Sequence, residues 1–177
     1  ERYGRLSAQP GLTFGLEQYV LVLLLKRPEL LTSMNTLLSG LGLEPLAGED
    51  FTGIEDKALF ESITAHIARY PDTNVEGLRQ DLEPSLHQTL DNVLSLREWV
   101  AFLPDEQAEL DASRCALRLR ELRLHRRNEE LRYLQEDARA QGDADATKHW
   151  GQMVNELALQ LVRVQKEKAA QGSLRNV

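Results

Sequence analysis

The chain has 177 residues, a net charge of −7 and 42% hydrophobic residues, which suits one compact domain with an ordinary buried core. Good helix formers, above all leucine, outnumber β-branched residues, and only 6% of the residues are aromatic, so the composition favours an all-α fold. The first 103 residues hold 8 Lys and Arg against 15 Asp and Glu, and this acidic balance argues against nucleic-acid binding there.

The cysteine content and the hydropathy of the chain indicate where in the cell the protein is expected. The one cysteine, Cys115, excludes an internal disulfide and a four-thiolate zinc site. The longest apolar run, Tyr19 to Leu25, is far shorter than the roughly 20 residues that cross a bilayer. The chain starts without a methionine or a signal peptide. We therefore expect a cytoplasmic protein without membrane association, and we read Glu1 as the cut edge of a longer chain.

The first part of the chain is predicted to be a short linker followed by a helical bundle. Residues 1–13 contain glycines and a proline and are interpreted as the remnant of an interdomain linker. Residues 14–104 are predicted to form the bundle. Tyr70 is expected to belong to the buried apolar stripe of the helix over residues 55–70, and Trp99 to face inward from the helix over residues 84–99. The predicted helices span residues 16–27, 28–38, 55–70, 75–82 and 84–99.

Residues 105–177 are predicted to form a long helix and an antiparallel two-helix hairpin. No glycine or proline occurs from Asp105 to Ala140, so one helix, or two nearly continuous ones, can span this stretch. Gly142 is expected to end it in a left-handed conformation, and Asp143 to cap the next helix, over residues 144–170. A turn this short makes the two helices antiparallel neighbours.

Apolar residues on both helices recur with the spacing of a coiled-coil seam. The first helix has them every seven residues, and the second has them alternately four and three residues apart. A seam of this kind closes the two helices against each other. The predicted seam consists of Leu110, Leu117, Leu124, Leu131 and Ala138 on the first helix and Trp150, Val154, Leu157, Leu161 and Val164 on the second.

More apolar residues lie off this seam, and a two-helix hairpin cannot bury a second stripe by itself. Either the hairpin folds back on the bundle or the stripe binds another protein. Leu122 is one of these residues. The candidate partner-binding residues are Tyr133, Leu134, Met153, Leu159 and Val162.

The search for catalytic motifs is negative. The chain has no glycine-rich phosphate loop and no Gly-x-Ser-x-Gly motif. His125 and Glu129 have a spacing that can hold a metal, but no further ligand is near in sequence, so they are interpreted as a surface pair. Asp143 and Asp145 open a helix and are interpreted as capping residues. Cys115 lies mid-helix and is expected to be a buried structural thiol. The sequence predicts no enzyme, metal or cofactor in this chain.

A basic run in the long helix offers an alternative function. Five arginines fall within ten residues, but Glu121, Glu129 and Glu130 are interspersed with or follow them. We interpret the run as a solvated, salt-bridged face. The alternative is a nucleic-acid-binding face. Its residues would be Arg118, Arg123, Arg126 and Arg127, with Arg120 as the fifth arginine of the run.

Several of these motifs resemble one known family. Residues 17–31 read EQYVLVLLLKRPELL, a leucine-rich helix, then basic residues, then Pro-Glu-Leu. Residues 115–120 read CALRLR, and a Gln-Gly-Asp turn at 141–143 precedes a long last helix. In this order, over nearly the whole chain from about Leu16, the motifs resemble the C-terminal helicase-binding domain of bacterial DNA primase.

The resemblance implies a function as well as a fold. Domains of this family have a helical bundle followed by a helical hairpin, and they dock on the N-terminal domain of the hexameric replicative helicase. Docking brings primer synthesis to the replication fork and modulates the helicase. The chain would then be a non-catalytic, monomeric part of a primase whose zinc-binding and polymerase domains lie upstream. Two alternatives stay open: an oligomerising scaffold of the helicase N-terminal type, and a weak binder of single-stranded nucleic acid.

Overall fold

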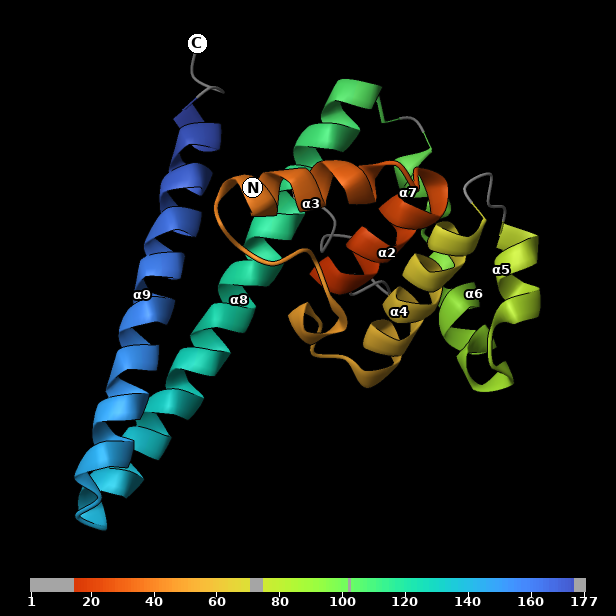
Figure 1. Ribbon diagram of the computed structural model, residues 1–177. Coiled ribbons are helices and arrows are strands. Elements are labelled where there is room, and N and C mark those ends of the chain that lie inside the picture. The colour runs from red at the N-terminus through yellow and green to blue at the C-terminus, as the bar shows by residue number, and fades with distance from the viewer. Residues whose placement is uncertain (1–14, 71–74, 102, 174–177) are drawn as a thin grey trace, which may run out of the picture.

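The computed structural model describes residues 15–70, 75–101 and 103–173, and within these ranges it is all-helical, without strands (Figure 1). The all-α prediction is therefore confirmed, whereas the linker predicted at 1–13 lies outside the described residues. The helices are α2 (Leu16–Lys26), α3 (Leu30–Gly40), α4 (Ile54–Arg69), α5 (Val75–Asp81), α6 (His87–Ser95), α7 (Arg97–Val100), α8 (Asp105–Ala140) and α9 (Ala144–Ser173), with 3-10 turns η1 (Gly48–Asp50) and η2 (Pro84–Leu86).

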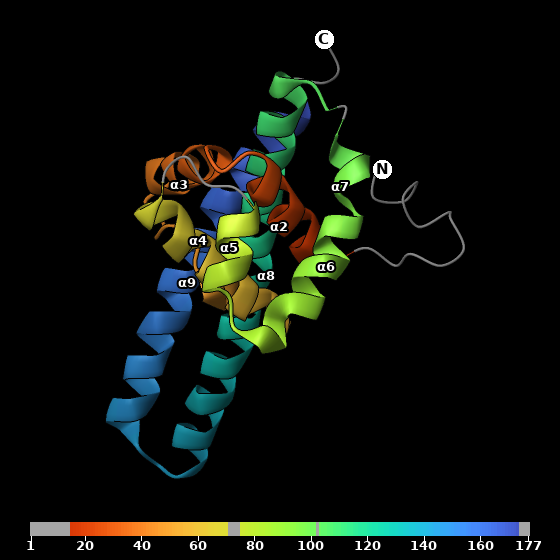
Figure 2. The same ribbon diagram turned by 90° about the vertical axis from the view of Figure 1, so that its right-hand side faces the viewer.

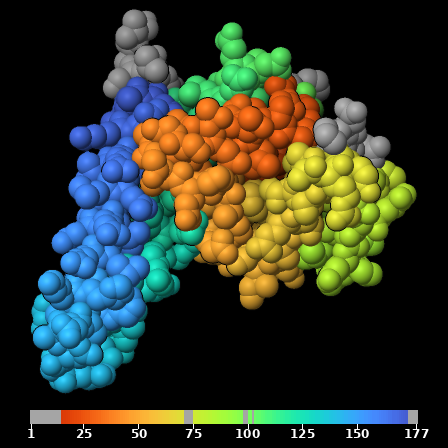
Figure 3. Space-filling view, in the orientation of Figure 1, coloured from red at the N-terminus to blue at the C-terminus, as the bar shows by residue number. Residues whose placement is uncertain are grey.

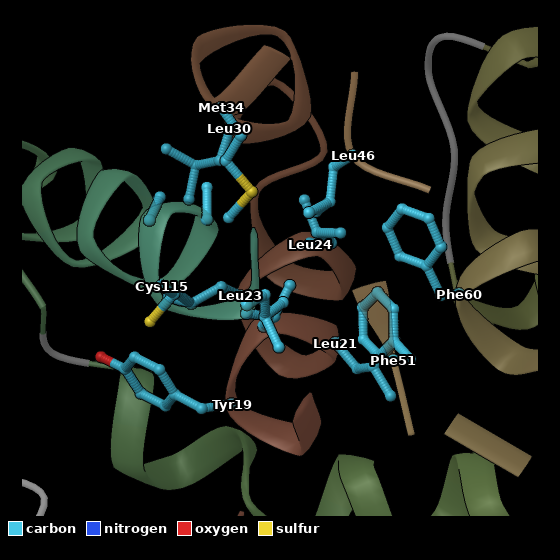
Figure 4. Packing of buried hydrophobic residues seen from close by; sticks show 14 of the residues in the cluster. Tyr19, Leu21, Leu23, Leu24, Leu30, Met34, Leu46, Phe51, Phe60 and Cys115 are labelled. Carbon is cyan, nitrogen blue, oxygen red and sulfur yellow. The ribbon is translucent and has the colours of Figure 1, made fainter. Parts of the chain in front are cut away.

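Helix α2 lies at the centre of the bundle. Every residue from Tyr19 to Leu24 is buried, and a helix that is apolar on all sides must be covered on all sides. Helices α3, α4, α6, α7 and α8 all contact it. Figure 4 shows α2 side chains near Cys115 of α8 on one side and near the stacked rings of Phe51 and Phe60 on another. The predicted burial of the Cys115 thiol is confirmed.

Two predictions about the bundle helices are wrong. The single helix expected over 84–99 is divided into η2, α6 and α7, with a break at Leu96. Leu96 is buried, and its N–H bonds to the Val93 carbonyl at 3.1 Å, so tertiary packing rather than a glycine or proline ends α6. Tyr70 is not part of a buried stripe: it follows the end of α4 and is 48% exposed. The Trp99 side chain lies outside what the structure describes.

Helix α3 starts two residues later than predicted. Pro28 lies in the turn before it, where its carbonyl accepts a hydrogen bond from the Leu31 N–H at 3.1 Å. The helix ends at Gly40, and Gly42 follows with a φ of 68°, a left-handed conformation that glycine adopts without strain. The Leu43 N–H reaches back to the Leu38 carbonyl at 3.0 Å, which closes the turn.

A buried ion pair fixes α8 to the loop between α3 and α4. The Arg120 guanidinium donates to both carboxylate oxygens of Asp50, at 2.7 and 3.0 Å, and both side chains are buried. It also donates to the carbonyls of Glu44 and Pro45, each at 2.9 Å. The Asp50 carboxylate accepts a further bond from the Ala47 N–H at 3.0 Å. This network positions α8 on the bundle.

Helices α8 and α9 lie side by side and run antiparallel (Figures 1 and 2). Helix α8 spans the predicted residues, Asp105 to Ala140, without a break. Gly142 has a φ of 74°, and the Asp143 N–H bonds to the Ala138 carbonyl at 2.9 Å, as in a Schellman turn. The Asp143 carboxylate then caps α9 by accepting from the Ala146 N–H at 2.9 Å. The predicted turn chemistry is confirmed.

The buried core continues from the bundle into the hairpin. One cluster of buried apolar residues joins α2, α3 and α4 to the first half of α8, from Ala108 to Leu124, and to Leu161 and Val164 of α9. The division into subdomains at residues 104 and 105 stays a prediction. The second half of α8 and the first half of α9 extend beyond the bundle as an arm (Figures 1 and 3).

Candidate protein-binding surface

The predicted seam lies between α8 and α9. Leu117, Leu124 and Leu131 are buried, and so are Leu161 and Val164 on the return helix. The remaining seam residues of α9 are partly buried, namely Trp150, Val154 and Leu157. The hairpin therefore closes on itself by apolar contact, and the first half of α8 packs on the bundle as well.

Polar contacts hold the end of α9 to α8. The Glu121 carboxylate, which is nearly buried, accepts hydrogen bonds from Lys168 of α9 and Arg118 of α8, both at 2.6 Å. Burial alone would raise the pKa of this carboxyl, but the hydrogen bonds from Lys168 and Arg118 outweigh it and hold the pKa below its usual value. The ionised carboxylate thus stabilises the junction of the two helices.

The candidate partner-binding residues are exposed to different degrees. Tyr133 is 72% exposed, Leu159 61% and Val162 45%. Leu134 is exposed at 36%, and Met153 is half-buried. Since large apolar side chains rarely stand this far out of a protein surface in groups, the exposed members are the strongest candidates for contact with a partner.

These five residues do not share one face of the hairpin. At 100° per residue, Leu159 points directly away from the seam of α9, and Val162 lies about 60° round the helix from Leu159. Tyr133 follows Arg126 by seven residues, close to two turns, and so lies on the face of α8 that packs on the bundle nearer its start. Leu134 and Met153 border the seam. The arm therefore carries two separate exposed apolar sites rather than the single second stripe that the sequence predicted.

The outer face of α9 is the first of these sites. It is formed by Leu159 and Val162, with Ala158 beside them and Asn155 and Lys166 one turn to either side. All five are exposed. Glu156, which is exposed and lies one turn before Leu159, borders this face about 60° round the helix from Leu159. We call Ala158, Leu159 and Val162 the α9 outer face.

The arginine run does not form one surface. Arg120 is buried in its ion pair with Asp50, and Arg123 lies 3.7 Å from a Glu44 carboxylate oxygen and 3.5 Å from one of Asp50. Arg126 donates to the Glu49 carbonyl at 3.2 Å. On the exposed side of the helix, two pairs remain: Arg118 with Glu121 at 2.6 Å and Arg127 with Glu130 at 2.9 Å. Each of these arginines already has a carboxylate or carbonyl partner, which favours the salt-bridged interpretation over a phosphate-binding face.

A third exposed apolar position was missed at the sequence level. Ile54, the first residue of α4, is 87% exposed. Its sequence neighbours Thr52 and Asp56 line an open groove of about 350 Å³ between the bundle and α8, whereas Ile54 itself does not line it. The sequence carried one weak signal, an isoleucine directly after Gly53 at the start of an acidic helix.

Other types of site receive no support from the geometry. In the described ranges, no group of three or more His, Cys, Asp or Glu side chains could hold a metal ion, so His125 and Glu129 gain no third ligand. No described helix is long and apolar enough to span a membrane. Comparison of the chain with protein-family models, curated proteins and solved structures gives no match.

Proposed function

We propose that this chain is a protein-interaction domain that docks on the N-terminal domain of a hexameric replicative helicase, as the C-terminal domain of bacterial primase does. The observation that carries the proposal is the pair of exposed apolar residues Leu159 and Val162 on a hairpin whose own seam is already closed. The leucine-rich helix followed by Arg27-Pro28-Glu29-Leu30, and the Gln-Gly-Asp turn, supply the identity of the partner, since both resemble the primase family.

The arm is suited to rigid docking. Helix α8 is continuous over 36 residues, and its first half belongs to the bundle core. A force or a restraint at the end of the arm is therefore transmitted to the bundle without a hinge in α8. In this proposal, the domain holds the upstream parts of a primase at a fixed orientation on the helicase and modulates helicase activity through the same contact.

The α9 outer face would provide the central contact. Buried apolar anchors contribute most of the affinity in protein interfaces, and polar residues around them exclude water. Asn155, Arg163 and Lys166 stand around Leu159 and Val162, whereas the Glu156 carboxylate, one turn before Leu159, would need a basic group of the partner when this face is buried. The exposed Tyr133 and the partly exposed Leu134 would add contacts only if the partner also reaches the other side of the arm.

A pull-down against the replicative helicase of the same organism tests the proposal. We expect the 177-residue protein to retain the helicase, and Val162→Asp to abolish retention while leaving the helix content unchanged. His149→Asp is the matched control, because it adds the same charge at an exposed position of α9 that lies about 20 Å along the helix and about 140° round it from Val162. Retention that is equal for both variants would remove the α9 outer face from the interface.

Light scattering and DNA binding address the two alternatives. A docking module of this kind runs as a monomer, whereas an oligomerising scaffold self-associates at micromolar concentration. A nucleic-acid binder would show affinity for single-stranded DNA that falls steeply with salt. We expect neither self-association nor such binding, because the arginines of α8 are paired within the chain.

A further inference from the structure

The second exposed apolar site of the arm is centred on Tyr133, whose side chain is 72% exposed. At 100° per residue, Tyr133 lies about 160° round α8 from Leu131, a buried residue of the seam, so it points away from α9. The bundle contacts this side of α8 as far as Arg126, which donates to the Glu49 carbonyl. Tyr133 lies about 10 Å further along the helix, on the arm that extends past the bundle (Figure 3). The aromatic ring therefore stands on a helix face that is left open beyond the bundle.

Two pairs of carboxylates flank Tyr133 along the helix. Glu129 and Glu130 lie one turn before it, Glu136 and Asp137 lie one turn after it, and all four side chains are exposed. Each lies within about 60° of Tyr133 round the helix, whereas no Lys or Arg between residues 128 and 140 does. The two pairs are seven residues, or about 10 Å, apart along the axis. We call these four acidic residues and Tyr133 the Tyr133 face.

The charge of the Tyr133 face is only partly compensated within the chain. Glu130 forms an exposed ion pair with Arg127 at 2.9 Å. Asp137 accepts a hydrogen bond from the uncharged side chain of Gln141 at 2.8 Å. In the part of the chain that the structure describes, the two remaining glutamates of the face form no ion pair. A net negative charge therefore surrounds an exposed aromatic ring.

This combination selects the chemistry of a ligand. The carboxylates do not converge on one point, and no group of three or more His, Cys, Asp or Glu among the described residues could hold a metal ion. Nucleic acid and anionic lipid are repelled by the negative charge. A polypeptide with separated cations fits, because each carboxylate pair can accept hydrogen bonds from one Lys or Arg. The ring between the pairs offers apolar area to a side chain placed between those cations.

A second copy of this chain is a poorer fit than a basic partner. Its α9 outer face has bases on one side of Leu159 only, namely Arg163 and Lys166. The Arg163 guanidinium already donates to the Leu41 carbonyl at 3.3 Å. On the other side, one turn before Leu159, stands Glu156, which would meet one of the carboxylate pairs.

We propose that the Tyr133 face binds a basic helix of a partner protein, one that carries two Lys or Arg residues seven positions apart and an apolar side chain midway between them. The two bases share the spacing of the two carboxylate pairs, and the apolar side chain packs on the Tyr133 ring. The apolar contact supplies affinity, and the charges supply orientation and salt dependence. The proposal does not rest on the identity of the helicase partner, because the α9 outer face lies on the other helix of the arm.

Fluorescence anisotropy with labelled peptides tests this proposal. The probe is an alanine-rich helical peptide of about 14 residues, with two arginines seven positions apart and a leucine midway between them. The control peptide has the same composition, but its leucine is moved to the opposite side of the helix. We expect the 177-residue protein to bind the probe about tenfold more tightly than the control. Tyr133→Ser should weaken binding of the probe about tenfold, because the apolar contact is lost. The double variant Glu129→Gln, Glu136→Gln should reduce the salt dependence of binding.

Two matched variants locate the contact. Tyr70→Ser also removes an exposed aromatic ring, but in the bundle, after the end of α4, and should bind the probe like the wild type. Leu159→Ser alters the α9 outer face and should also bind the probe normally, so a failure here is separate from a failure of helicase docking. Equal affinity for the two peptides, or unchanged affinity in Tyr133→Ser, would overturn the proposal. So would self-association of the wild type that Tyr133→Ser abolishes, since the occupant would then be a second copy.

Discussion

Replacing Arg120 by methionine should destabilise the whole domain, although Arg120 lies in a run of arginines that looks like a solvated surface. The substitution removes the guanidinium that donates to Asp50 at 2.7 and 3.0 Å and to the carbonyls of Glu44 and Pro45 at 2.9 Å. The Asp50 carboxylate would stay buried with one backbone donor, the Ala47 N–H, and with Arg123 3.5 Å away.

The magnitude follows from the cost of a buried charge without its partner. Breaking a buried ion pair by removing one member costs about 3–5 kcal/mol. The free energy of unfolding of a domain is about 5–15 kcal/mol, so the loss is a large fraction of it. For a chain of this length, it corresponds to a decrease in Tm of roughly 6–20 °C. Arg118→Met is the matched control, because Arg118 is half exposed, and it should cost less than about 1 kcal/mol.

A double-mutant cycle measured by urea unfolding, with circular dichroism at 222 nm, checks this reasoning. Asp50→Asn alone leaves the Arg120 charge buried without a counterion and should be costly as well. The double variant removes both charges and should cost clearly less than the sum of the single changes. If Arg120→Met costs less than about 1 kcal/mol, or if the two changes are additive, the buried ion pair does not hold α8 on the bundle.

Three further predictions concern the hairpin and its turns. Leu157→Asp places a charge in the α8–α9 seam and should lower the melting temperature, whereas Val162→Asp should leave the melting temperature within a few degrees of the wild-type value. Equal loss of helix in both variants would show that the faces are misassigned. The pKa of Glu121 in the folded protein lies below its unfolded value of about 4.3, so its pairing stabilises the protein above that pH, and this stabilisation is lost as the pH falls through the folded pKa. Glu121→Gln should therefore make the free energy of unfolding less dependent on pH below about 5. An unchanged pH profile would contradict this. Gly142→Ala should lower the free energy of unfolding by about 1 kcal/mol in thermal unfolding, because Gly142 has a φ of 74°. Gly40→Ala should instead raise it by up to about 1 kcal/mol, because Gly40 is at a helical position with open space around it. A change of the same sign in both variants would refute the argument.

The long helix and its turn could be predicted from sequence because their determinants are local. The uninterrupted stretch from Asp105 to Ala140 contains no residue that breaks a helix, and Gly142 and Asp143 satisfy the backbone groups at the two helix ends. The seam residues follow a fixed period, so their common face can be read directly from the spacing. Nothing in these features depends on the rest of the fold.

The features that were missed depend on contacts between distant residues. Arg120 and Asp50 are 70 residues apart, and in the sequence Arg120 is indistinguishable from the exposed arginines beside it. The end of α6 at Leu96 is set by burial, without a glycine or proline to mark it. The five predicted contact residues were grouped as one stripe, and their helical positions separate them into different faces.

Isothermal titration calorimetry of the 177-residue protein against the replicative helicase of the same organism tests the central claim most directly. We predict association with a Kd at or below tens of micromolar, loss of that association in the folded variants Leu159→Asp and Val162→Asp, and unchanged association in His149→Asp. No heat of binding at tens of micromolar, or equal affinity in all three variants, would contradict the proposal that the α9 outer face docks this domain on the helicase.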